Sequence, residues 1–222
     1  MLFVFDVNET LLDLAPLDDV VAEAVGAAPG DAGPRQAWFD RMIRSALALT
    51  AAGEYVAFGA LAGAALRDLG NERGSDVTDT QVGALAQRIQ RLPAHPDSAP
   101  ALRGLGAQGH RIVALTNSVL DVAEAQLQAS GLRELIDAVY SADEVQRLKP
   151  APEPYRMVLE REHAESATLV AAHDWDVAGA AAAGFDSVFV AREGRRAFSA
   201  ARTPTYVVDD LSAFVASTNV RV

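Results

Sequence analysis

The residue that most clearly suggests chemistry is an aspartate at the end of an apolar run. Residues 2–5 are Leu-Phe-Val-Phe, and Asp6 follows them directly. Such a run is typical of a buried parallel strand. A carboxylate at the edge of a buried strand is costly unless water or a cation stabilises it. Taken alone, Asp6 would be an ordinary cap of the next turn, so its interpretation depends on three later segments.

The first of these segments contains short polar side chains at another predicted strand end. Thr116, Asn117 and Ser118 come directly after the apolar run Ile112–Leu115. Such side chains, together with the free N–H groups of a following helix, can bind a carboxylate or an anion. The alternative is an ordinary helix N-cap at Asn117 or Ser118.

The second segment ends in the dipeptide Lys149-Pro150. The proline restricts the backbone of Lys149 to an extended conformation. A lysine held in this way can place its ammonium group on a nucleophilic carboxylate and keep that carboxylate ionised. The alternative is a solvated surface lysine, which is the usual environment of this residue type.

The third segment combines acids, a histidine and a tryptophan after a further apolar run. Its residues are His173, Asp174, Trp175 and Asp176. His173 is a candidate proton shuttle, and Trp175 is a candidate pocket wall. Taken alone, a hydrogen-bonded loop histidine and a core tryptophan would be equally ordinary interpretations.

Five apolar runs predict the strands that would position these side chains: 2–5, 112–115, 169–172, 187–190 and 206–208. Helical patterns follow several of them, at 119–129, 152–163 and 175–183. Alternating strands and helices predict an α/β fold with a doubly wound, Rossmann-like parallel sheet. Ligands of such sheets bind beyond the carboxyl ends of the strands.

A long stretch between the first two strands contains helical patterns only. Four helices are predicted, at residues 16–27, 36–51, 55–69 and 78–92, with a loop at 71–76. We therefore expect residues 14–96 to form a four-helix cap, inserted into a core made of residues 1–13 and 97–222.

Composition excludes several classes of function. The formal net charge is −11, which makes nucleic acids and anionic membranes poor partners. The chain has no cysteine, so disulfides, thiolate zinc sites and a cysteine nucleophile are excluded. The first ten residues carry no basic region, and no apolar run reaches the length of a membrane span. A cytoplasmic location is expected.

Asp6 with its apolar run and the three later segments, in this order along the chain, resemble the haloacid dehalogenase superfamily. Within it, they are most similar to the type II 2-haloacid dehalogenases. Six residues match the dehalogenase pattern: Lys149, Tyr155, Trp175, Asp176, Thr10 after the nucleophile, and Phe58 in the predicted cap. The resemblance implies a homodimer, a small anionic 2-haloacid as substrate, and no cofactor or metal.

The resemblance also implies a mechanism and a set of site residues. Asp6 would displace halide from C2 of a short 2-haloalkanoic acid, and water would then hydrolyse the aspartyl ester to give the 2-hydroxyacid. The resemblance assigns supporting roles to the other site residues. Lys149 would hold Asp6; Thr116 and Asn117 would bind the substrate carboxylate, with Asn8 as a further substrate-binding residue; Asp176, with His173, would activate water; Thr10 and Tyr155 would donate supporting hydrogen bonds; and Phe39, Phe58 and Trp175 would form an apolar wall.

Several positions depart from the type II pattern. An aromatic is usual where this chain has Asn8, and a halide-binding arginine is usual where it has Phe39. A serine and an asparagine are replaced by Ala171 and His173. Arg41 is the nearest alternative cation, but it shares a helical face with Trp38 rather than with Phe39, so we expect it to point away from the site.

Two alternative functions remain open at this point. One is a superfamily phosphatase, although such enzymes normally carry an aspartate where this chain has Asn8 and a metal-binding aspartate where it has Ala172. The other is a catalytically silent binding protein on the same scaffold.

Overall fold

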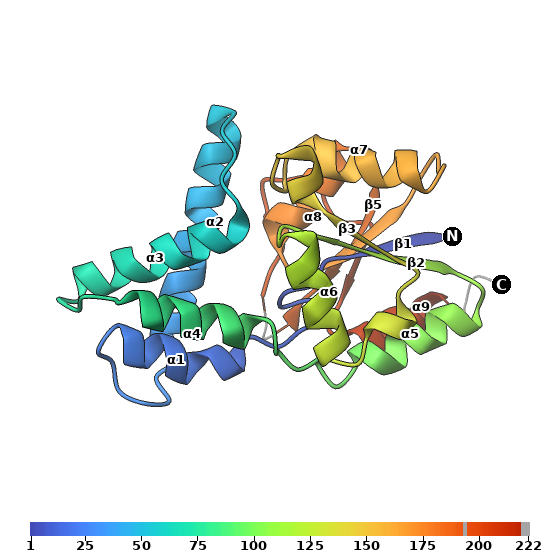
Figure 1. Cartoon of the computed structure of the whole chain (residues 1–222). Helices are drawn as coiled ribbons and strands as arrows, with labels where there is room; N and C mark the ends of the chain where they lie inside the picture. The colour runs from blue at the N-terminus through green and yellow to red at the C-terminus, as the bar shows by residue number, and fades with distance from the viewer. Residues whose placement is uncertain (193–194, 219–222) are drawn as a thin grey trace.

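A computed structural model describes residues 1–192 and 195–218 of the chain (Figure 1). In this part of the chain, six parallel strands form one sheet in the order β3-β2-β1-β4-β5-β6. The strands are β1 (Leu2–Phe5), β2 (Arg111–Thr116), β3 (Ala138–Ser141), β4 (Thr168–Ala171), β5 (Asp186–Val190) and β6 (Tyr206–Val208).

The central strand β1 places Asp6 at the middle of the carboxyl edge of the sheet. All four residues of β1 are buried, and Phe5 pairs with Ala114 of β2 and with Val170 of β4. The backbone N–H of Asp6 continues the ladder by donating to the carbonyl of Val170 at 3.1 Å. Residues that end β2 and β4 therefore lie beside Asp6, at the topological switch point where such sheets bind ligands.

Helices cover both faces of the sheet. Phe3 and Phe5 pack in one apolar cluster with α5 (Ser98–Ala107), α6 (Leu120–Ala129) and α9 (Leu211–Thr218). Leu2 and Val4 point the other way, as alternation along a strand requires, and pack with α7 (Pro152–Arg161) and α8 (Asp174–Ala182).

The cap follows β1 and lies to one side of the sheet in Figure 1. It begins with a 3₁₀ turn at Ala15–Leu17, and its helices are α1 (Asp18–Ala24), α2 (Gly33–Ala52), α3 (Phe58–Glu72) and α4 (Asp79–Ile89). Trp38 of α2 donates its indole N–H to the carbonyl of Ala62 in α3 at 2.9 Å, which ties these two helices together. The prediction of a doubly wound parallel sheet with an inserted helical cap is confirmed.

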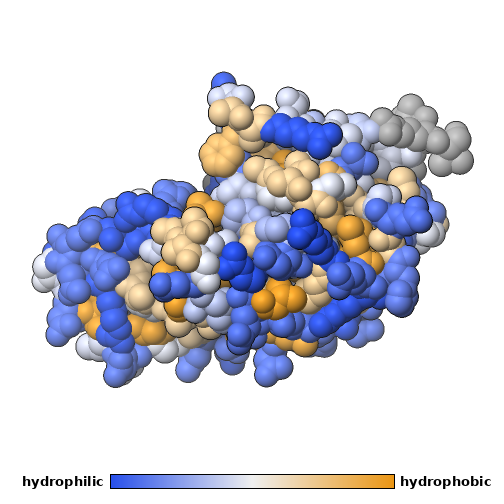
Figure 2. Space-filling model, turned by 90° about the horizontal axis from the view of Figure 1, so that it is seen from above, coloured by the Kyte–Doolittle hydropathy of each residue, from blue (hydrophilic) through white to orange (hydrophobic). Residues whose placement is uncertain are grey.

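Some predicted boundaries are corrected. The predicted first cap helix is broken into a 3₁₀ turn and α1, and α3 extends through Asn71 and Glu72, which were assigned to a loop. No described helix is long and apolar enough to cross a membrane. Viewed from above, hydrophilic side chains cover most of the surface, and hydrophobic ones form small separate patches (Figure 2).

Candidate active site

Lys149 forms the centre of a buried ion cluster. Its side chain is 1% exposed. Its ammonium group donates to Asp6 Oδ1 at 2.8 Å, to Asp176 Oδ2 at 2.7 Å and to the carbonyl of Leu115 at 2.9 Å. Burial alone would lower the pKa of Lys149, but the two carboxylates raise it, so the lysine is charged.

Two contacts fix the backbone around Lys149. Asn117 accepts the N–H of Lys149 on its amide oxygen at 2.8 Å and donates to the carbonyl of Lys149 at 3.4 Å. Gly179 of α8 lies against Pro150 so closely that a Cβ at this position would lie 2.7 Å from the Pro150 carbonyl oxygen. Asn117, expected to bind substrate, therefore uses its amide to position Lys149.

Asp6 is surrounded by hydrogen-bond donors. Besides Lys149 on Oδ1, its Oδ2 accepts the hydroxyl of Thr10 at 2.7 Å and lies 3.2 Å from His173 Nδ1. Burial would raise the pKa of Asp6, but Lys149 and His173 more than offset this effect and hold its pKa well below the usual range. Asp6 is thus an ionised carboxylate that is 4% exposed.

Asp176 is fully buried, and both of its carboxylate oxygens accept hydrogen bonds. Its Oδ2 accepts from Lys149, and its Oδ1 accepts the hydroxyl of Tyr155 at 2.5 Å. Burial, followed by the nearby charge of Asp6, raises the pKa of Asp176 despite the attraction of Lys149. Tyr155 lies behind Asp176, is also fully buried, and lines none of the described cavities. Both residues support Lys149 from the side away from the cavity.

His173 bridges two carboxylates. Its Nδ1 faces Asp6, and its Nε2 lies 3.0 Å from Oε2 of Glu9. The imidazole is stacked between the rings of Phe39 and Trp175, at centroid distances of 5.5 and 5.0 Å. Burial alone would lower the pKa of His173, but the hydrogen bonds and charges of Asp6 and Glu9 raise it to about 9. At neutral pH His173 is therefore an imidazolium that donates to both acids.

Glu9 is the site residue that the sequence reasoning missed. It is buried, its φ is +60°, and Arg195 donates to both of its oxygens at 2.8 Å. Arg35 of the cap lies 3.5 Å away. Burial would raise the pKa of Glu9, but His173 and Arg195 lower it to about 2. A left-handed backbone at a glutamate is strained, and such strain is concentrated at functional sites.

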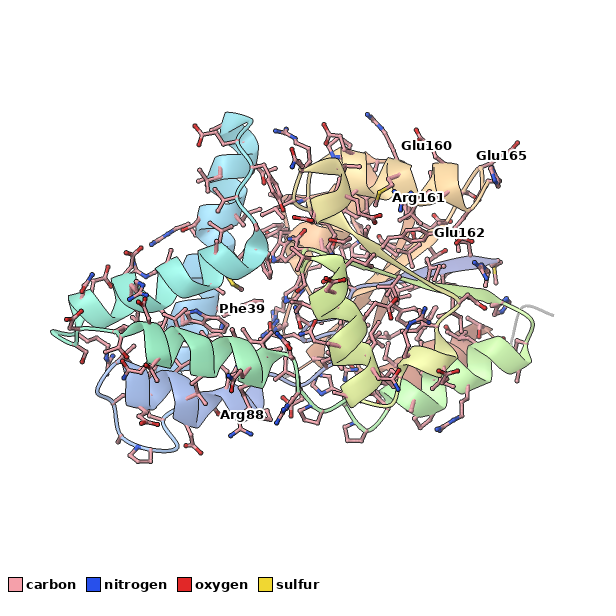
Figure 3. The ribbon with its side chains drawn as sticks, in the orientation of Figure 1. Phe39, Arg88, Glu160, Arg161, Glu162 and Glu165 are labelled. Atoms are coloured by element: carbon pink, nitrogen blue, oxygen red, sulfur yellow. The ribbon has the colours of Figure 1, made fainter. Side chains whose placement is uncertain are left out.

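A small cavity beside Asp6 brings most of the predicted residues together. Its volume is about 10 Å³, which is roughly the space of one water molecule. It is lined by Asp6, Asn8, Phe39, Ile43, Phe58, Thr116, Asn117, Lys149, His173 and Trp175. Figure 3 shows Phe39 on the side of α2 that faces the sheet.

The predicted orientation of the cap helix agrees with the contacts. Phe39 and Ile43 face the cavity, whereas Arg41 pairs with Glu72 at the end of α3. The ring of Phe39 stacks instead on the imidazole of His173. Two other residues that line this cavity accept hydrogen bonds from the chain. The hydroxyl oxygen of Thr116 accepts the backbone N–H of Ser118 at 3.1 Å, and the amide oxygen of Asn8 accepts from the side chain of Gln126 at 3.0 Å.

A larger cavity of about 410 Å³, called the polar cavity below because charged side chains form part of its mostly apolar wall, adjoins this site. The two cavities share Phe39, Ile43, His173 and Trp175. The larger one adds side chains of both charges: Asp40, Arg44, Asp174, Arg195 and Arg196. His173 therefore borders both the nucleophile and a space that can hold many water molecules.

The acids of the site do not fit a divalent metal. Lys149 lies between Asp6 and Asp176, where it contacts one oxygen of each, and donors from the chain contact their other oxygens. Within residues 1–192 and 195–218, no group of three or more acids and histidines has metal-site geometry. A cation that replaced Lys149 would have to displace an ammonium group that already satisfies both carboxylates.

The family model of the haloacid dehalogenase-like hydrolases matches residues 1–184. The chain belongs to this hydrolase family. The site described above therefore lies in a haloacid dehalogenase-like hydrolase, at the carboxyl edge of its sheet and beneath its cap.

Individual members of the family resemble the chain over most of its length. The (S)-2-haloacid dehalogenase 4A of Burkholderia cepacia is 29% identical over 197 residues, which are 86% of this chain and 83% of that protein. The haloacetate dehalogenase H-2 of Moraxella sp. (strain B) is 25% identical and covers 95% of this chain and 94% of its own length. The structure of the L-2-haloacid dehalogenase from Xanthobacter autotrophicus with covalently bound chloropropionic acid matches with a TM-score of 0.89 and 25% identity, over 100% of both chains.

Proposed function

We propose that this hydrolase cleaves the carbon–halogen bond of a 2-haloalkanoic acid and forms an aspartyl ester on Asp6. The observation that carries the proposal is a buried, ionised carboxylate at the cavity wall, held by Lys149 and His173, with Asn8 two residues later. An amide cannot protonate a leaving group. Halide is a leaving group that needs no proton, whereas the alcohol released from a phosphate ester does.

In the first step, an oxygen of Asp6 attacks C2 of the substrate, and the halide leaves with the electron pair of the carbon–halogen bond. The hydroxyl of Thr116 accepts a backbone hydrogen bond and can donate its own hydrogen to the substrate carboxylate. Phe39, Phe58 and Trp175 keep bulk water from the reacting atoms.

In the second step, His173 activates the water. Ester formation removes the negative charge of Asp6, one of the two charges that raise the pKa of His173, so the imidazolium gives its proton to water in the polar cavity. Nδ1 then accepts a proton from the water molecule whose oxygen attacks Cγ of Asp6. Asp176 is less suited to this task, since Lys149 and Tyr155 occupy both of its oxygens.

When the ester bond breaks, His173 protonates the departing oxygen of the 2-hydroxyacid. The new carboxyl group of Asp6 then gives its remaining proton to His173, which restores the original ion pair. Each turnover consumes one water molecule and releases the halide, the 2-hydroxyacid and one proton. Glu9 acts throughout as a positioning residue that holds the ring through Nε2.

A halide-release assay tests the proposal. We expect chloride or bromide release from chloroacetate, bromoacetate or one enantiomer of 2-chloropropionate, and none from the Asp6→Asn variant. Hydrolysis of small phosphate esters without any halide release would instead assign the phosphatase function. Failure of the wild-type protein in both assays would contradict both assignments.

A further inference from the structure

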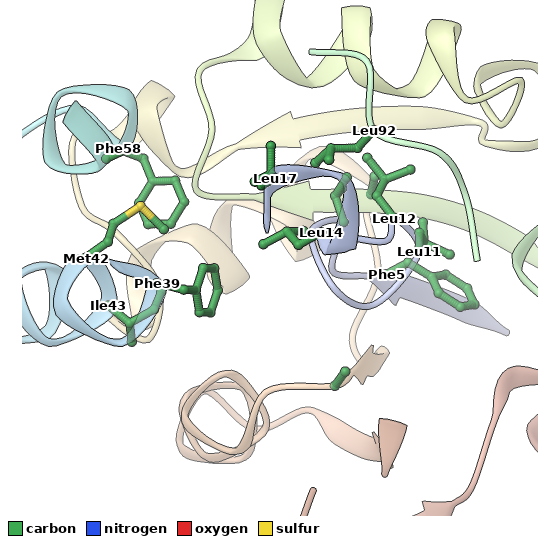
Figure 4. Packing of buried hydrophobic residues seen from close by; sticks show 14 of the residues in the cluster. Phe5, Leu11, Leu12, Leu14, Leu17, Phe39, Met42, Ile43, Phe58 and Leu92 are labelled. Carbon is green, nitrogen blue, oxygen red and sulfur yellow. The ribbon is translucent and has the colours of Figure 1, made fainter. Parts of the chain in front are cut away.

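A second large cavity lies between the cap and the sheet, and its walls are apolar. Its volume is about 270 Å³. Side chains from the cap, among them Leu17, Trp38 and Met42, line it together with Leu92 of the segment that returns to the core and Val122 of α6. Figure 4 shows Met42 and Phe58 facing Leu14, Leu17 and Leu92 across this space. Among the described lining residues there is no charged side chain, and the only polar ones are Asn8 and Ser118.

This apolar cavity adjoins the cavity at Asp6. Asn8, Phe39 and Phe58 line both spaces. The polar cavity lies beyond His173 and, among the described residues, shares only Phe39 with the apolar one. A substrate whose C2 atom reacts at Asp6 therefore lies between two cavities. One is bordered by charged side chains, and the other is apolar.

The space at Asp6 itself is too small for a whole 2-haloacid. Its volume of about 10 Å³ is comparable to one water molecule, so the groups that C2 carries must extend into neighbouring spaces. Protein interiors are close-packed, and voids larger than a water molecule are few. An apolar cavity of about 270 Å³ that adjoins the space at Asp6 is therefore large enough to bind part of a substrate.

We propose that the apolar cavity binds an extended hydrocarbon substituent on C2 of the 2-haloacid, such as an alkyl chain of about four to six carbons or a phenyl ring. This inference rests on the proposed function. An apolar cavity of about 150 Å³ is known to bind benzene, so the larger volume here accommodates a group of this size. Uncharged walls favour a hydrocarbon over a polar or charged substituent, because a polar group would lose its hydration there without a partner.

The test is a series of 2-bromoalkanoic acids from bromoacetate to 2-bromooctanoate, with 2-bromo-2-phenylacetate added. We expect kcat/KM to rise about fourfold for each methylene until the cavity is filled. We expect halogen-free alkanoates of the same lengths to show the same trend as competitive inhibitors. A kcat/KM that is flat or falls beyond 2-bromopropionate, with no trend in inhibition, would overturn the inference.

A cavity-filling variant makes the test specific. Val122 of α6 lines the cavity, so Val122→Phe should reduce the ratio of kcat/KM for 2-bromohexanoate to that for bromoacetate by tenfold or more. Gln128→Phe adds an aromatic ring to the exposed face of the same helix and should leave this ratio unchanged. Equal ratios in both variants and the wild type would contradict the cavity assignment. If the wild-type protein releases no bromide even from bromoacetate, the proposed function fails rather than this inference.

Discussion

At the scale of single residues, the site is a set of buried charges that compensate one another. Asp6 and Asp176 share the ammonium of Lys149, while Asp6 and Glu9 share the imidazolium of His173. Removing one member of such a set leaves another buried charge without its partner, which is strongly destabilising. This arrangement keeps Asp6 ionised in a cavity about the size of one water molecule, as a nucleophilic carboxylate requires.

The role of His173 predicts a separation of the two half-reactions. His173→Phe keeps a flat ring between Phe39 and Trp175 but removes both N–H groups. We expect about one equivalent of halide per active site to be released rapidly, followed by turnover at least about 100-fold slower. Mass spectrometry should show the ester on the peptide that contains Asp6. Slow halide release in the first turnover, without accumulation of the ester, would assign His173 to the alkylation step instead.

The same residue predicts a loss of stability at alkaline pH. The pKa of His173 is about 9 in the folded protein and about 6.5 in the unfolded chain. A raised pKa in the folded state stabilises the fold fully below pH 6.5, and this stabilisation, about 3 kcal/mol, is lost as the pH rises to 9. Urea unfolding at pH 6 and pH 9.5 should show this loss in the wild type and not in His173→Phe. Equal pH dependence in both proteins would contradict the buried ion pair.

At the scale of elements, the contact between α8 and the loop of Lys149 sets the position of the ammonium group. A methyl group at Gly179 would meet three atoms of Pro150 at 2.5 to 2.8 Å, two of them backbone atoms. We expect Gly179→Ala to cost about 1–3 kcal/mol of stability and to lower kcat at least tenfold by displacing Lys149.

Gly83 in the middle of α4 provides the matched control. No atom of the described part of the chain, apart from its own helix backbone and chain neighbours, lies within 4 Å of a Cβ at this position. Gly83→Ala should therefore be neutral or stabilise the protein by about 0.5–1 kcal/mol, because alanine favours the helix. Thermal unfolding and halide-release rates of the two variants provide the comparison. If Gly179→Ala were as active as Gly83→Ala, the account of how Lys149 is positioned would be wrong.

Elements with a strong apolar pattern could be predicted from the sequence, whereas elements with mixed composition could not. Strand β1 and strand β6 were predicted with the bounds that the structure shows. Strand β3 was missed, since its four residues include two that are only half-buried and its apolar run is too short to stand out. Helix α5 was missed because Pro100 suggests a loop, although it lies in the first turn, where its missing N–H costs nothing.

The site could be predicted in part for the same reason. Asp6, Thr116 and Asp176 end or follow strands β1, β2 and β4, so their meeting follows from the topology of the sheet, whereas Lys149 follows the missed strand β3 and was expected beside Asp6 from the Lys-Pro dipeptide and the family resemblance. The partners of Glu9 come from a cap helix and from a loop after β5, and sequence spacing says nothing about such contacts. One sequence signal could have identified Glu9: it is an acid that closely follows the candidate nucleophile Asp6.

At the scale of the whole molecule, the cap and the sheet enclose a site that supplies its own cations. Phe39 and Phe58 come from the cap, while Asp6 and Lys149 come from the core, so the cavity exists only where the two parts meet. The chain as a whole is acidic, with a net charge of −11. Attraction of an anionic substrate must therefore come from the local cations of the site rather than from the overall charge.

This arrangement predicts that activity survives removal of metal ions. Because Lys149 and His173 neutralise the acids at the nucleophile, halide release should be unchanged, within about twofold, after dialysis against EDTA. Addition of Mg²⁺ should give no increase. Loss of activity on EDTA treatment that Mg²⁺ restores would contradict the assignment of these cations and favour the phosphatase function.

Isotope labelling distinguishes an ester intermediate on Asp6 from direct attack of water on the substrate. The protein in excess is mixed with a 2-haloacid in H₂¹⁸O, so that each molecule turns over at most once. We predict that the hydroxyl oxygen of the 2-hydroxyacid is unlabelled, because it comes from Asp6, and that ¹⁸O appears in the peptide that contains Asp6. ¹⁸O in the product of this first turnover, with an unlabelled Asp6, would show that water attacks the substrate directly and would contradict the account.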